Sequence, residues 1–363
     1  MSIRISVPGR TELAGNHTDH QGGHVLAAAV DRFLTAEVEP CAESATVVSA
    51  GFGECSVSLR ETEAPRNEAG TPAALLRGVL EYLRNAGCPV GGFRAAVQSE
   101  IPAGAGLSSS AAFGVLIGRI VSRLYAADAI PALTLAKAAQ YAENVHFGKP
   151  CGLMDPCACA FGGVSLIDFQ DETPAVETIR TSLFAPEYRL LTADTGGSHR
   201  NLTADYAAIP AEMRRVAAYF GKTRLRDVPE AAFFAALPEI RKETSDRAVL
   251  RSLHFYGEER RVPAMARALR DGDAAAYLRL MDESGRSSAE YLQNQFSGQD
   301  QAIPLALALC RSVLGSEGAA RVHGGGFAGM VQVFAPAERV GALKMALEPV
   351  FGAGCVGELK IES

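Results

Sequence analysis

The sequence predicts an α+β protein of two domains. At 363 residues the chain is longer than one hydrophobic core usually accommodates, which favours two domains of ordinary size. Residues 33–60 alternate apolar and polar positions, as antiparallel strands do. Segments with apolar residues at helical spacing follow them. Near the end, ARVH and MVQVF flank a glycine-rich turn and precede a helix and a last strand. That order is typical of helices laid on an antiparallel sheet.

The same periodicities predict the elements in turn. Residues 72–85 carry apolar side chains at three- and four-residue intervals and indicate a helix, as do residues 108–126 and 131–147. Residues 210–297 are mostly helical by pattern, with a Gly-Asp break at 272–273, and a last helix is expected at 337–347. Strands are expected at 4–7, 24–31, 93–98, 162–169 and 188–192. The polar stretch 171–174 predicts the boundary between a first domain, 1–175, and a second, 176–363.

Charge and composition narrow the class of protein. The chain has 35 basic and 41 acidic residues and a net charge of −6, with no basic stripe, so neither nucleic acid nor an acidic membrane surface is an expected partner. No apolar run is long enough to cross a bilayer, and the N-terminus lacks the apolar core of a signal peptide. The eight cysteines match no common zinc pattern. We expect a cytoplasmic enzyme with reduced thiols.

The stretch IPAGAGLSSSAAFG, residues 101–114, has the chemistry of an anion site. Its glycines allow close backbone approach, its serines offer hydroxyls, and the following helix presents unpaired N–H groups and the positive end of its dipole. Ser108 could simply cap that helix. Capping explains one serine but not three in a row, so phosphate binding is the preferred interpretation.

The stretch RTELAGNHTDHQGG, residues 10–23, is unusually polar and is expected to be a loop between two strands. Its Asn and Asp side chains could close turns within the loop. Its histidines and aspartate could bind a metal, although a loop with two glycines does not fix such ligands at a defined spacing. Its mixed donors and acceptors could instead recognise the adjacent hydroxyls of a sugar.

Two further segments are ambiguous on spacing alone. Asp155 precedes a proline, the usual start of a helix, so a capping role competes with a catalytic one. Residues 324–329, GGGFAG, match a dinucleotide-binding fingerprint by letter, but a strand pattern follows them and too little chain remains for that domain. They predict a glycine-rich turn, and their spacing does not decide whether the turn touches a ligand.

Three separated motifs resemble, in order and spacing, those of the GHMP small-molecule kinases: PGRTELAGNHTDH at 8–20, PAGAGLSSSA at 102–111 and HGGGFAG at 323–329. The HTD core of the first motif and the CGLMD segment at 151–155 are similar to the galactokinase family in particular. The resemblance runs through almost the whole chain. It implies an N-terminal domain like ribosomal protein S5 and a C-terminal ferredoxin-like α/β sandwich. The implied reaction transfers phosphate from ATP, with Mg²⁺, to the anomeric hydroxyl of galactose.

The resemblance also assigns roles to single positions. Asp155 matches the catalytic aspartate and Arg10 the active-site arginine, while Ser110 and Glu143 match the residues that hold Mg²⁺. The residues expected to wrap the ATP phosphates are Gly104, Ala105, Gly106, Leu107, Ser108, Ser109 and Ser110. The residues expected to contact the sugar are Asn16, His17, Thr18, Asp19, Gly152 and Tyr206.

Some positions depart from the family pattern. Many galactokinases have Asn where this chain has Glu12, Glu where it has Asn16, and Tyr where it has His20. In the family, position 16 lies near the sugar's C6 hydroxyl, so a neutral Asn16 would tolerate a C6 carboxylate or a missing C6 better than Glu would. A 1-kinase for N-acetylgalactosamine, arabinose or a uronic acid is therefore an alternative to galactokinase. A non-catalytic sugar sensor on the same fold is another. The resemblance leaves the oligomeric state open, and a monomer is expected.

Overall fold

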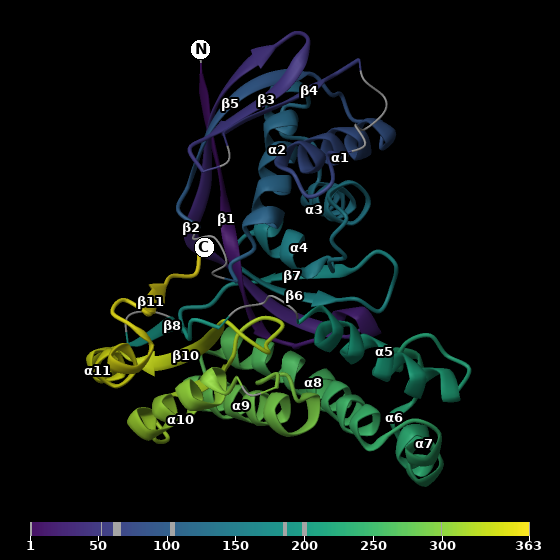
Figure 1. Cartoon of the computed structure of the whole chain (residues 1–363), viewed down its shortest axis with the longest axis vertical. Coiled ribbons are helices and arrows are strands. Elements are labelled where there is room, and N and C mark those ends of the chain that lie inside the picture. Colours follow the sequence, from purple (N-terminus) through teal and green to yellow (C-terminus); the bar gives the residue numbers. More distant parts are fainter. Residues whose placement is uncertain are drawn as a thin grey trace. The chain divides into compact units, whose positions relative to one another are not determined.

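The computed structural model describes residues 2–51, 53–60, 67–101, 106–183, 187–197, 202–298 and 300–362. The chain forms two compact units (Figure 1). The first contains the N-terminus up to Arg10 and Ala28–Gly163, and the second contains Thr11–Ala27 and Val164–Ile361. The domain division predicted after residue 175 stays a prediction. Residues 11–27 belong to the second compact unit although they lie near the N-terminus.

The first unit combines a sheet with a group of helices. Its strands lie in the order β4-β3-β5-β2, with β1 also paired to β2. β3 runs parallel to β5, whereas the β2–β5 and β3–β4 pairs are antiparallel. The strands are β1 (Ile3–Ala14), β2 (His24–Cys41), β3 (Ser44–Ser49), β4 (Gly53–Ser58) and β5 (Gly92–Ser99), of which β1 and β2 each continue into the second unit. The helices are α1 (Pro72–Asn85), α2 (Ser109–Tyr125), α3 (Ala132–Tyr141), the π-helical turn η2 (Ala142–Phe147) and α4 (Met154–Phe161).

Local sequence explains why these helices form and how they pack. α1 begins where predicted because Thr71 accepts a hydrogen bond from the N–H of Ala74 and a proline occupies the first turn. Helices α1 to α4 pack against one another (Figure 1). Small residues bring their backbones close: a side chain at Gly114 would meet the Cβ atom of Ala139 at 2.7 Å. The helical segments predicted at 72–85 and 108–126 are confirmed.

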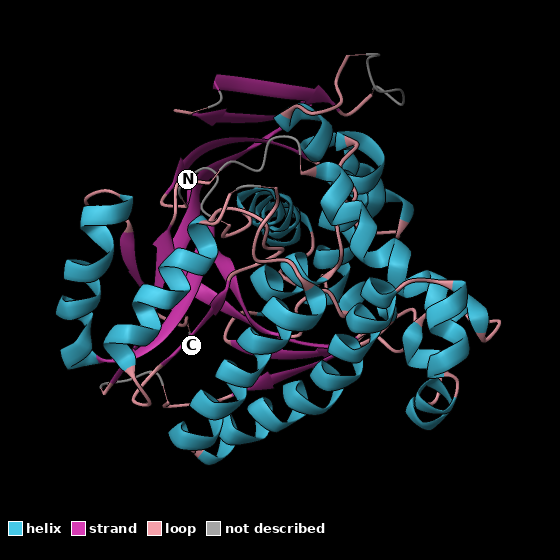
Figure 2. Ribbon diagram, turned by 60° about the horizontal axis from the view of Figure 1, so that its bottom comes forward, coloured by secondary structure: helices cyan, strands magenta, loops and turns pink. Residues whose placement is uncertain are grey.

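The second unit contains a further sheet and most of the helices. Figure 2 shows the helices of the chain in cyan and its strands in magenta. The four-stranded sheet of the second unit has the order β11-β8-β10-β9, and β6 and β7 form an antiparallel pair in which β6 also neighbours β2. The strands are β6 (Val164–Asp168), β7 (Ala175–Ile179), β8 (Tyr188–Asp194), β9 (Ala319–Val322), β10 (Met330–Pro336) and β11 (Val356–Leu359). The helices are α5 (Thr203–Tyr219), α6 (Glu230–Ala235), α7 (Leu237–Glu243), α8 (Asp246–Asp271), α9 (Ala274–Ser287), α10 (Ala302–Leu314) and α11 (Val340–Phe351). Short turns are η1 (Asp19–Gln21), η3 (Leu225–Asp227), η4 (Ser288–Leu292) and η5 (Ala337–Arg339).

Alternation along the strands gives the four-stranded sheet two different faces. Val331 and Val333 of β10 join a core with α10 and α11. Between them Gln332 points the other way, since successive side chains of a strand face opposite sides. Arg321 of β9 lies directly across from Gln332 in the antiparallel register. Both of these polar side chains are fully buried, so this face of the sheet must supply them with hydrogen-bond partners.

The break predicted at 272–273 is confirmed and has a local cause. Gly272 ends α8 with a φ of 69°, a left-handed conformation that glycine adopts without strain. Asp273 then caps α9 by accepting a hydrogen bond from the N–H of Ala276.

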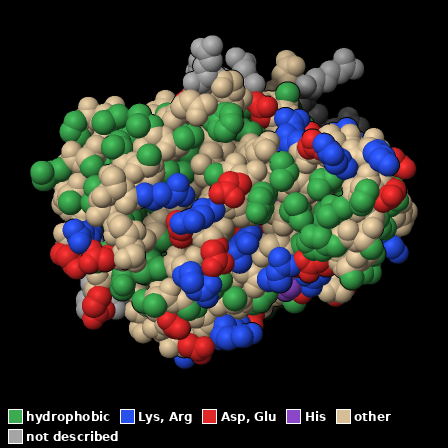
Figure 3. Space-filling model, turned by 90° about the horizontal axis from the view of Figure 1, so that it is seen from below, with side chains coloured by type: hydrophobic (Ala, Val, Ile, Leu, Met, Phe, Trp, Pro, Cys, Tyr) green, Lys and Arg blue, Asp and Glu red, His purple; other side chains and the backbone are tan. Residues whose placement is uncertain are grey.

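Acidic and basic side chains are interspersed over the face shown in Figure 3, and α9 itself carries the ion pairs Arg279–Glu283 and Arg286–Asp282.

Two sequence predictions differ from the structure. The stretch expected to be a loop from residue 10 begins as strand, because β1 continues to Ala14. There the buried Thr11 and Glu12 form hydrogen bonds with residues that are distant in sequence. The helix expected over 131–147 stops being α-helical after Tyr141 and ends in the π-helical turn η2. Among the described residues, no helix combines the length and apolar character needed to cross a membrane.

Candidate functional site

Arg10 and Asp155 form a two-pronged ion pair in the first unit. The Nε atom of Arg10 donates to Oδ1 of Asp155 and its Nη2 atom donates to Oδ2, both at 2.6 Å. Arg10 lies on β1, and Asp155 lies in the first turn of α4. Leu153 occupies the N-cap position, so the side chain of Asp155 does not cap the helix. The capping interpretation of Asp155 is therefore wrong, because its carboxylate accepts hydrogen bonds from Arg10 instead.

Ser108 adds a third contact to this carboxylate. Its hydroxyl donates to Oδ2 of Asp155, although the residue occupies the N-cap position of α2, with a φ of 57° and no side-chain capping bond. Burial alone would raise the pKa of Asp155, but the charge of Arg10 and the hydrogen bonds from Arg10 and Ser108 lower it below its usual value. Asp155 is thus ionised at neutral pH. Ser108 occupies the N-cap position, but its hydroxyl donates to Asp155 and does not cap the helix.

The C-terminal half of the predicted phosphate loop contacts Arg10. Gly104 and Ala105 lie outside the described residues. The carbonyl of Gly106 accepts a hydrogen bond from Nη1 of Arg10 at 2.5 Å, and the carbonyl of Leu107 accepts one from the Arg10 backbone N–H at 3.1 Å. The other two serines, Ser109 and Ser110, form the first turn of α2, and Ser109 is exposed. Their N–H groups lie at the end of the helix that attracts anions.

Glu143 occupies the π-helical turn η2, a kind of helix distortion that is frequent at functional sites. It is 3% exposed, and its Oε1 atom has no hydrogen-bond partner among the described residues. Burial, together with the charge of Glu143 and a hydrogen bond to its carboxylate, raises the pKa of the nearby Cys151 thiol. Gly152 follows and is exposed. A buried carboxylate oxygen without a partner fits a divalent cation, which prefers such hard oxygen ligands.

An apolar cavity of about 310 Å³ adjoins the start of α2 in the first unit. Its walls are mainly aliphatic and aromatic, and Ser109 and Ser110 form one side of it. Val47, Val97, Ile101, Phe113 and Phe147 are among its lining residues. A cavity of this size next to an anion-binding helix end suits a flat, largely apolar group attached to phosphates.

The residues predicted to contact the sugar lie in the second unit, apart from Gly152. Asn16 is 1% exposed, and Thr18 is fully buried, with its hydroxyl donating to the carbonyls of Gly15 and His24 at 2.8 and 2.7 Å. His17 has a φ of 58°, and Asp19 opens the short turn η1. Tyr206 lies on α5 and packs edge-on against Phe327, with ring centroids 5.2 Å apart.

Two side chains of α8 anchor this loop, and sequence reasoning missed both. His254 donates from Nε2 to the carbonyl of Asn16 at 2.9 Å, and Glu258 accepts from the N–H of Gly15 at 3.0 Å. Both side chains are fully buried. Their spacing of four residues puts them on one face of the helix, and two ionisable residues so placed in a helical segment were the signal available in the sequence.

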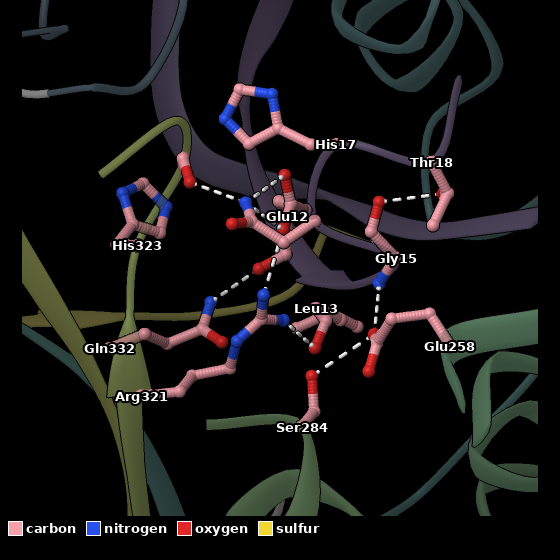
Figure 4. A network of polar contacts seen from close by, with 12 residues as sticks. Glu12, Leu13, Gly15, His17, Thr18, Glu258, Ser284, Arg321, His323 and Gln332 are labelled. Carbon is pink, nitrogen blue, oxygen red and sulfur yellow. Dashed lines mark hydrogen bonds and ion pairs between the residues drawn. The ribbon is translucent and has the colours of Figure 1, made fainter. Parts of the chain in front are cut away.

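A buried ion pair supports the strand that precedes the loop (Figure 4). Arg321 donates to the carboxylate of Glu12 at 2.9 Å and to the carbonyl of Leu13 at 2.5 Å. Its cross-strand neighbour Gln332 donates to the Thr11 hydroxyl at 2.7 Å and to the Glu12 carbonyl at 2.9 Å. These contacts explain why β1 can continue as a strand through polar residues. Arg321 and Gln332, on one face of the four-stranded sheet, supply the hydrogen bonds that those residues need.

The predicted residues therefore form two sets. In the first unit the structure brings together Arg10, Asp155, Ser108 and the end of the predicted phosphate loop. In the second unit it brings Asn16, His17 and Tyr206 to the glycine-rich turn at 324–326. The first set can hold an anion and accept a proton. The second set forms a polar loop whose side chains are hydrogen-bonded to the turn.

Family models and curated relatives match this chain. A family model described as "GHMP kinases N terminal domain" matches residues 74–163, and one described as "Galactokinase galactose-binding signature" matches residues 2–40. A galactokinase of Streptomyces coelicolor is 33% identical over 352 residues, covering 96% of this chain and 88% of the relative. A galactokinase of Homo sapiens is 34% identical over 337 residues, covering 90% and 82%.

Solved structures share the fold. The crystal structure of Lactococcus lactis galactokinase complexed with galactose aligns with a TM-score of 0.85 at 22% identity, covering 100% of this chain and 94% of that one. The Methanococcus jannaschii mevalonate kinase aligns with a TM-score of 0.69 at 15% identity, covering 100% and 99%. The fold is thus that of the GHMP kinases, and the identity to the curated relatives over most of both lengths is specific. The chain belongs to the galactokinase family of the GHMP kinases.

Proposed function

We propose that this protein transfers the γ-phosphoryl group of ATP to the anomeric hydroxyl of galactose, giving galactose 1-phosphate and ADP. Membership of the galactokinase family supports the substrate. The observation that carries the chemistry is the Asp155 carboxylate, which Arg10 and Ser108 hold ionised. It is the described group best suited to accept a proton beside the end of an anion-binding loop.

In the proposed reaction the anomeric oxygen forms a bond to the γ-phosphorus while the bond from that phosphorus to the bridging oxygen of ADP breaks. Asp155 takes the proton from the sugar hydroxyl. Because Arg10 lowers the pKa of Asp155, this carboxylate is a weak base. Most of the rate must therefore come from positioning the reactants and from stabilising charge on the transferring group, as is general for phosphoryl transfer. The guanidinium of Arg10 supplies part of the positive charge that stabilises the transferring group.

The nucleotide is assigned to the first unit. Residues 104–110 would wrap the phosphates with backbone N–H groups and hydroxyls, and the 310 Å³ cavity beside Ser109 and Ser110 would take the adenine ring. Ser110 and Glu143 would hold Mg²⁺. The Oε1 atom of Glu143, which has no hydrogen-bond partner among the described residues, supports that role. When bound, the ion would neutralise phosphate charge that protein groups alone leave uncompensated.

The location and assembly of the protein are also proposals. All eight cysteines are described and are free thiols, which supports the reducing cytoplasm. We propose a monomer that acts on ATP and a sugar, without a nucleic-acid or membrane partner. Light scattering of the purified protein at several concentrations tests the monomer.

The decisive experiment measures ATP consumption with Mg²⁺ against a panel of sugars: galactose, N-acetylgalactosamine, arabinose and galacturonic acid. Turnover with galactose at the highest kcat/KM supports the proposal. Turnover with another sugar but not with galactose contradicts the substrate and keeps the kinase. Sugar binding without turnover on any of them, with ATP and Mg²⁺ present, would show a sensor on the same fold.

A further inference from the structure

One carboxylate on α1 holds two side chains that lie five residues apart in the sequence. The hydroxyl of Tyr141 donates to the Oε1 atom of Glu81 at 2.5 Å, and the Nε2 atom of His146 lies 3.3 Å from the Oε2 atom of Glu81. The two rings also contact each other, with centroids 5.7 Å apart. The hydrogen bond to Glu81, together with burial, raises the pKa of Tyr141 to about 12, so its hydroxyl remains a donor at neutral pH.

Both side chains reach Glu81 because the helix between them is π-helical. In an α-helix each residue turns the chain by about 100°, so residues five apart lie about 140° apart around the axis. Tyr141 is the last residue of α3, and His146 lies in the turn η2. The wider register is present in the backbone, since the N–H of Gly148 donates to the carbonyl of Glu143, five residues earlier. The contacts of Glu81 therefore favour the π-helical form over the α-helical one.

A glycine of α1 lets this helix approach the turn closely. Gly78 lies three residues before Glu81, on the same face of α1. A Cβ atom at Gly78 would lie 2.6 Å from the Cα atom of Ala142, the first residue of η2. The last residue of η2 is held as well, because the carbonyl of Phe147 accepts from the N–H of Gly70 at 3.1 Å. The turn is thus fixed at both of its ends.

Glu143 is the residue whose place depends on this register. It is the second residue of η2 and is 3% exposed, and its Oε1 atom has no hydrogen-bond partner among the described residues. A return to α-helical spacing would rotate one part of the segment against the other by about 100°, the turn of one residue. Such a rotation would move the Glu143 carboxylate relative to the helices packed around it.

We propose that Glu81 positions the magnesium ligand Glu143 by selecting the π-helical form of η2. Glu81 is a positioning residue: it acts through Tyr141 and His146 and does not bind the ion itself. The inference rests on the proposed function in one respect, that Glu143 binds Mg²⁺. It gives a role to contacts on α1 that neither the phosphate loop nor the proposed base uses.

Glu81→Ala and Glu283→Ala form a matched pair that tests this role. Both glutamates lie on helices and are partly exposed, and each contacts neighbouring side chains, Arg279 in the case of Glu283. We expect Glu81→Ala to raise the Mg²⁺ concentration for half-maximal activity by about tenfold, the usual effect of removing a group that orients a metal ligand. The KM for galactose should change little. Glu283→Ala should change neither quantity, and equal Mg²⁺ requirements for the two variants would overturn the proposal.

Two milder substitutions keep the test independent of the stability of Glu81→Ala. Glu81→Gln retains an oxygen that accepts from Tyr141, so its Mg²⁺ requirement should lie closer to that of the unsubstituted enzyme. Tyr141→Phe removes one of the two contacts and retains the ring, so its requirement should be raised, but by less than in Glu81→Ala. Melting temperatures without Mg²⁺ report any loss of stability. A fall in kcat that saturating Mg²⁺ does not restore in these variants would show a general structural role and contradict the proposal.

Binding of ADP gives a readout that does not need catalysis. Calorimetry measures the Kd of ADP with Mg²⁺ and with EDTA, and the ratio of the two values reports how much the ion strengthens binding. Glu81→Ala, Glu143→Gln and the double variant should all lower this ratio. The double variant should match Glu143→Gln, because Glu81 acts only through Glu143. Additive effects of the two substitutions would overturn the proposal.

The two levels of proposal fail in different ways. An unchanged ratio in Glu143→Gln contradicts the cation site of the proposed function. A lowered ratio in Glu143→Gln, with an unchanged one in Glu81→Ala, contradicts the positioning role alone.

Discussion

His254 should make the second unit sensitive to acid, and His254→Gln should remove that sensitivity. The imidazole is fully buried on α8, where its Nε2 atom donates to the carbonyl of Asn16 and its Nδ1 atom contacts the Ser287 hydroxyl at 2.8 Å. Burial lowers the pKa of His254 to about 4, outweighing the opposite effects of the Glu258 charge and the hydrogen bond to Asn16. The nearby charges of Arg261 and His17 lower it further.

The size and sign of the effect follow from that shift. An unfolded chain binds a proton on this histidine near its ordinary pKa of 6.5, whereas the folded protein resists until about pH 4. Between these values the unfolded state holds more protons, so the free energy of unfolding falls as the pH falls. The difference between a pKa of 6.5 and one of about 4, at about 1.4 kcal/mol per pKa unit, corresponds to about 3.5 kcal/mol. That stability is fully present above pH 6.5 and is lost by about pH 4.

Urea unfolding measures this loss directly. The chain has no tryptophan, so far-ultraviolet circular dichroism is the suitable signal, recorded from about pH 7 down to about pH 4.5. Glutamine can still donate to the Asn16 carbonyl but does not titrate, so His254→Gln should be less stable at pH 7 and show a flatter pH dependence. Ser287→Ala removes the neighbouring hydroxyl and keeps the imidazole, so its pH dependence should stay steep. An equally steep fall in His254→Gln would refute this reasoning.

The remaining predictions concern the first unit. Asp155→Asn should lower kcat by about 10²–10⁴-fold, the usual effect of losing a general base, with a smaller effect on the KM for ATP; near-normal turnover would show that another group accepts the proton. Ser108→Ala should raise the pKa of Asp155, because Ser108 donates to its carboxylate, and should move the acid limb of the kcat profile to higher pH. Ser108→Gly should shift that limb equally while relieving the strain at a φ of 57°, and unshifted profiles in both variants would exclude the effect. Glu143→Gln should raise the Mg²⁺ concentration for half-maximal activity by about tenfold or more, which is about 1.4 kcal/mol. Its melting temperature without Mg²⁺ should be equal or higher, because a neutral amide is less costly to bury; an unchanged Mg²⁺ requirement would remove Glu143 from the proposed cation site.

Much of the fold could be predicted from local patterns. The helix at 72–85 has the bounds expected from its apolar spacing and its Thr-Pro start, and the break at 272–273 lies where a glycine ends one helix and an aspartate caps the next. These features depend on residues within a few positions of each other. The length of β1 was underestimated because it depends on residues far away in the sequence. Its polar end is stable only because Arg321 and Gln332, about three hundred positions away, supply its hydrogen bonds.

The chemical class of the site also followed from sequence, because the motif residues are few and ordered along the chain. Their individual interactions did not. Ser108 was a candidate helix cap, and its hydroxyl donates to Asp155; Asn16 was expected to contact the sugar, and its amide bonds the Gly324 carbonyl, 308 positions away. A side chain's type states which bonds it can make, and composition and spacing are enough to propose a phosphate loop and a base. Which of those bonds it does make depends on the groups that folding brings within about 3 Å, and only the tertiary structure decides that.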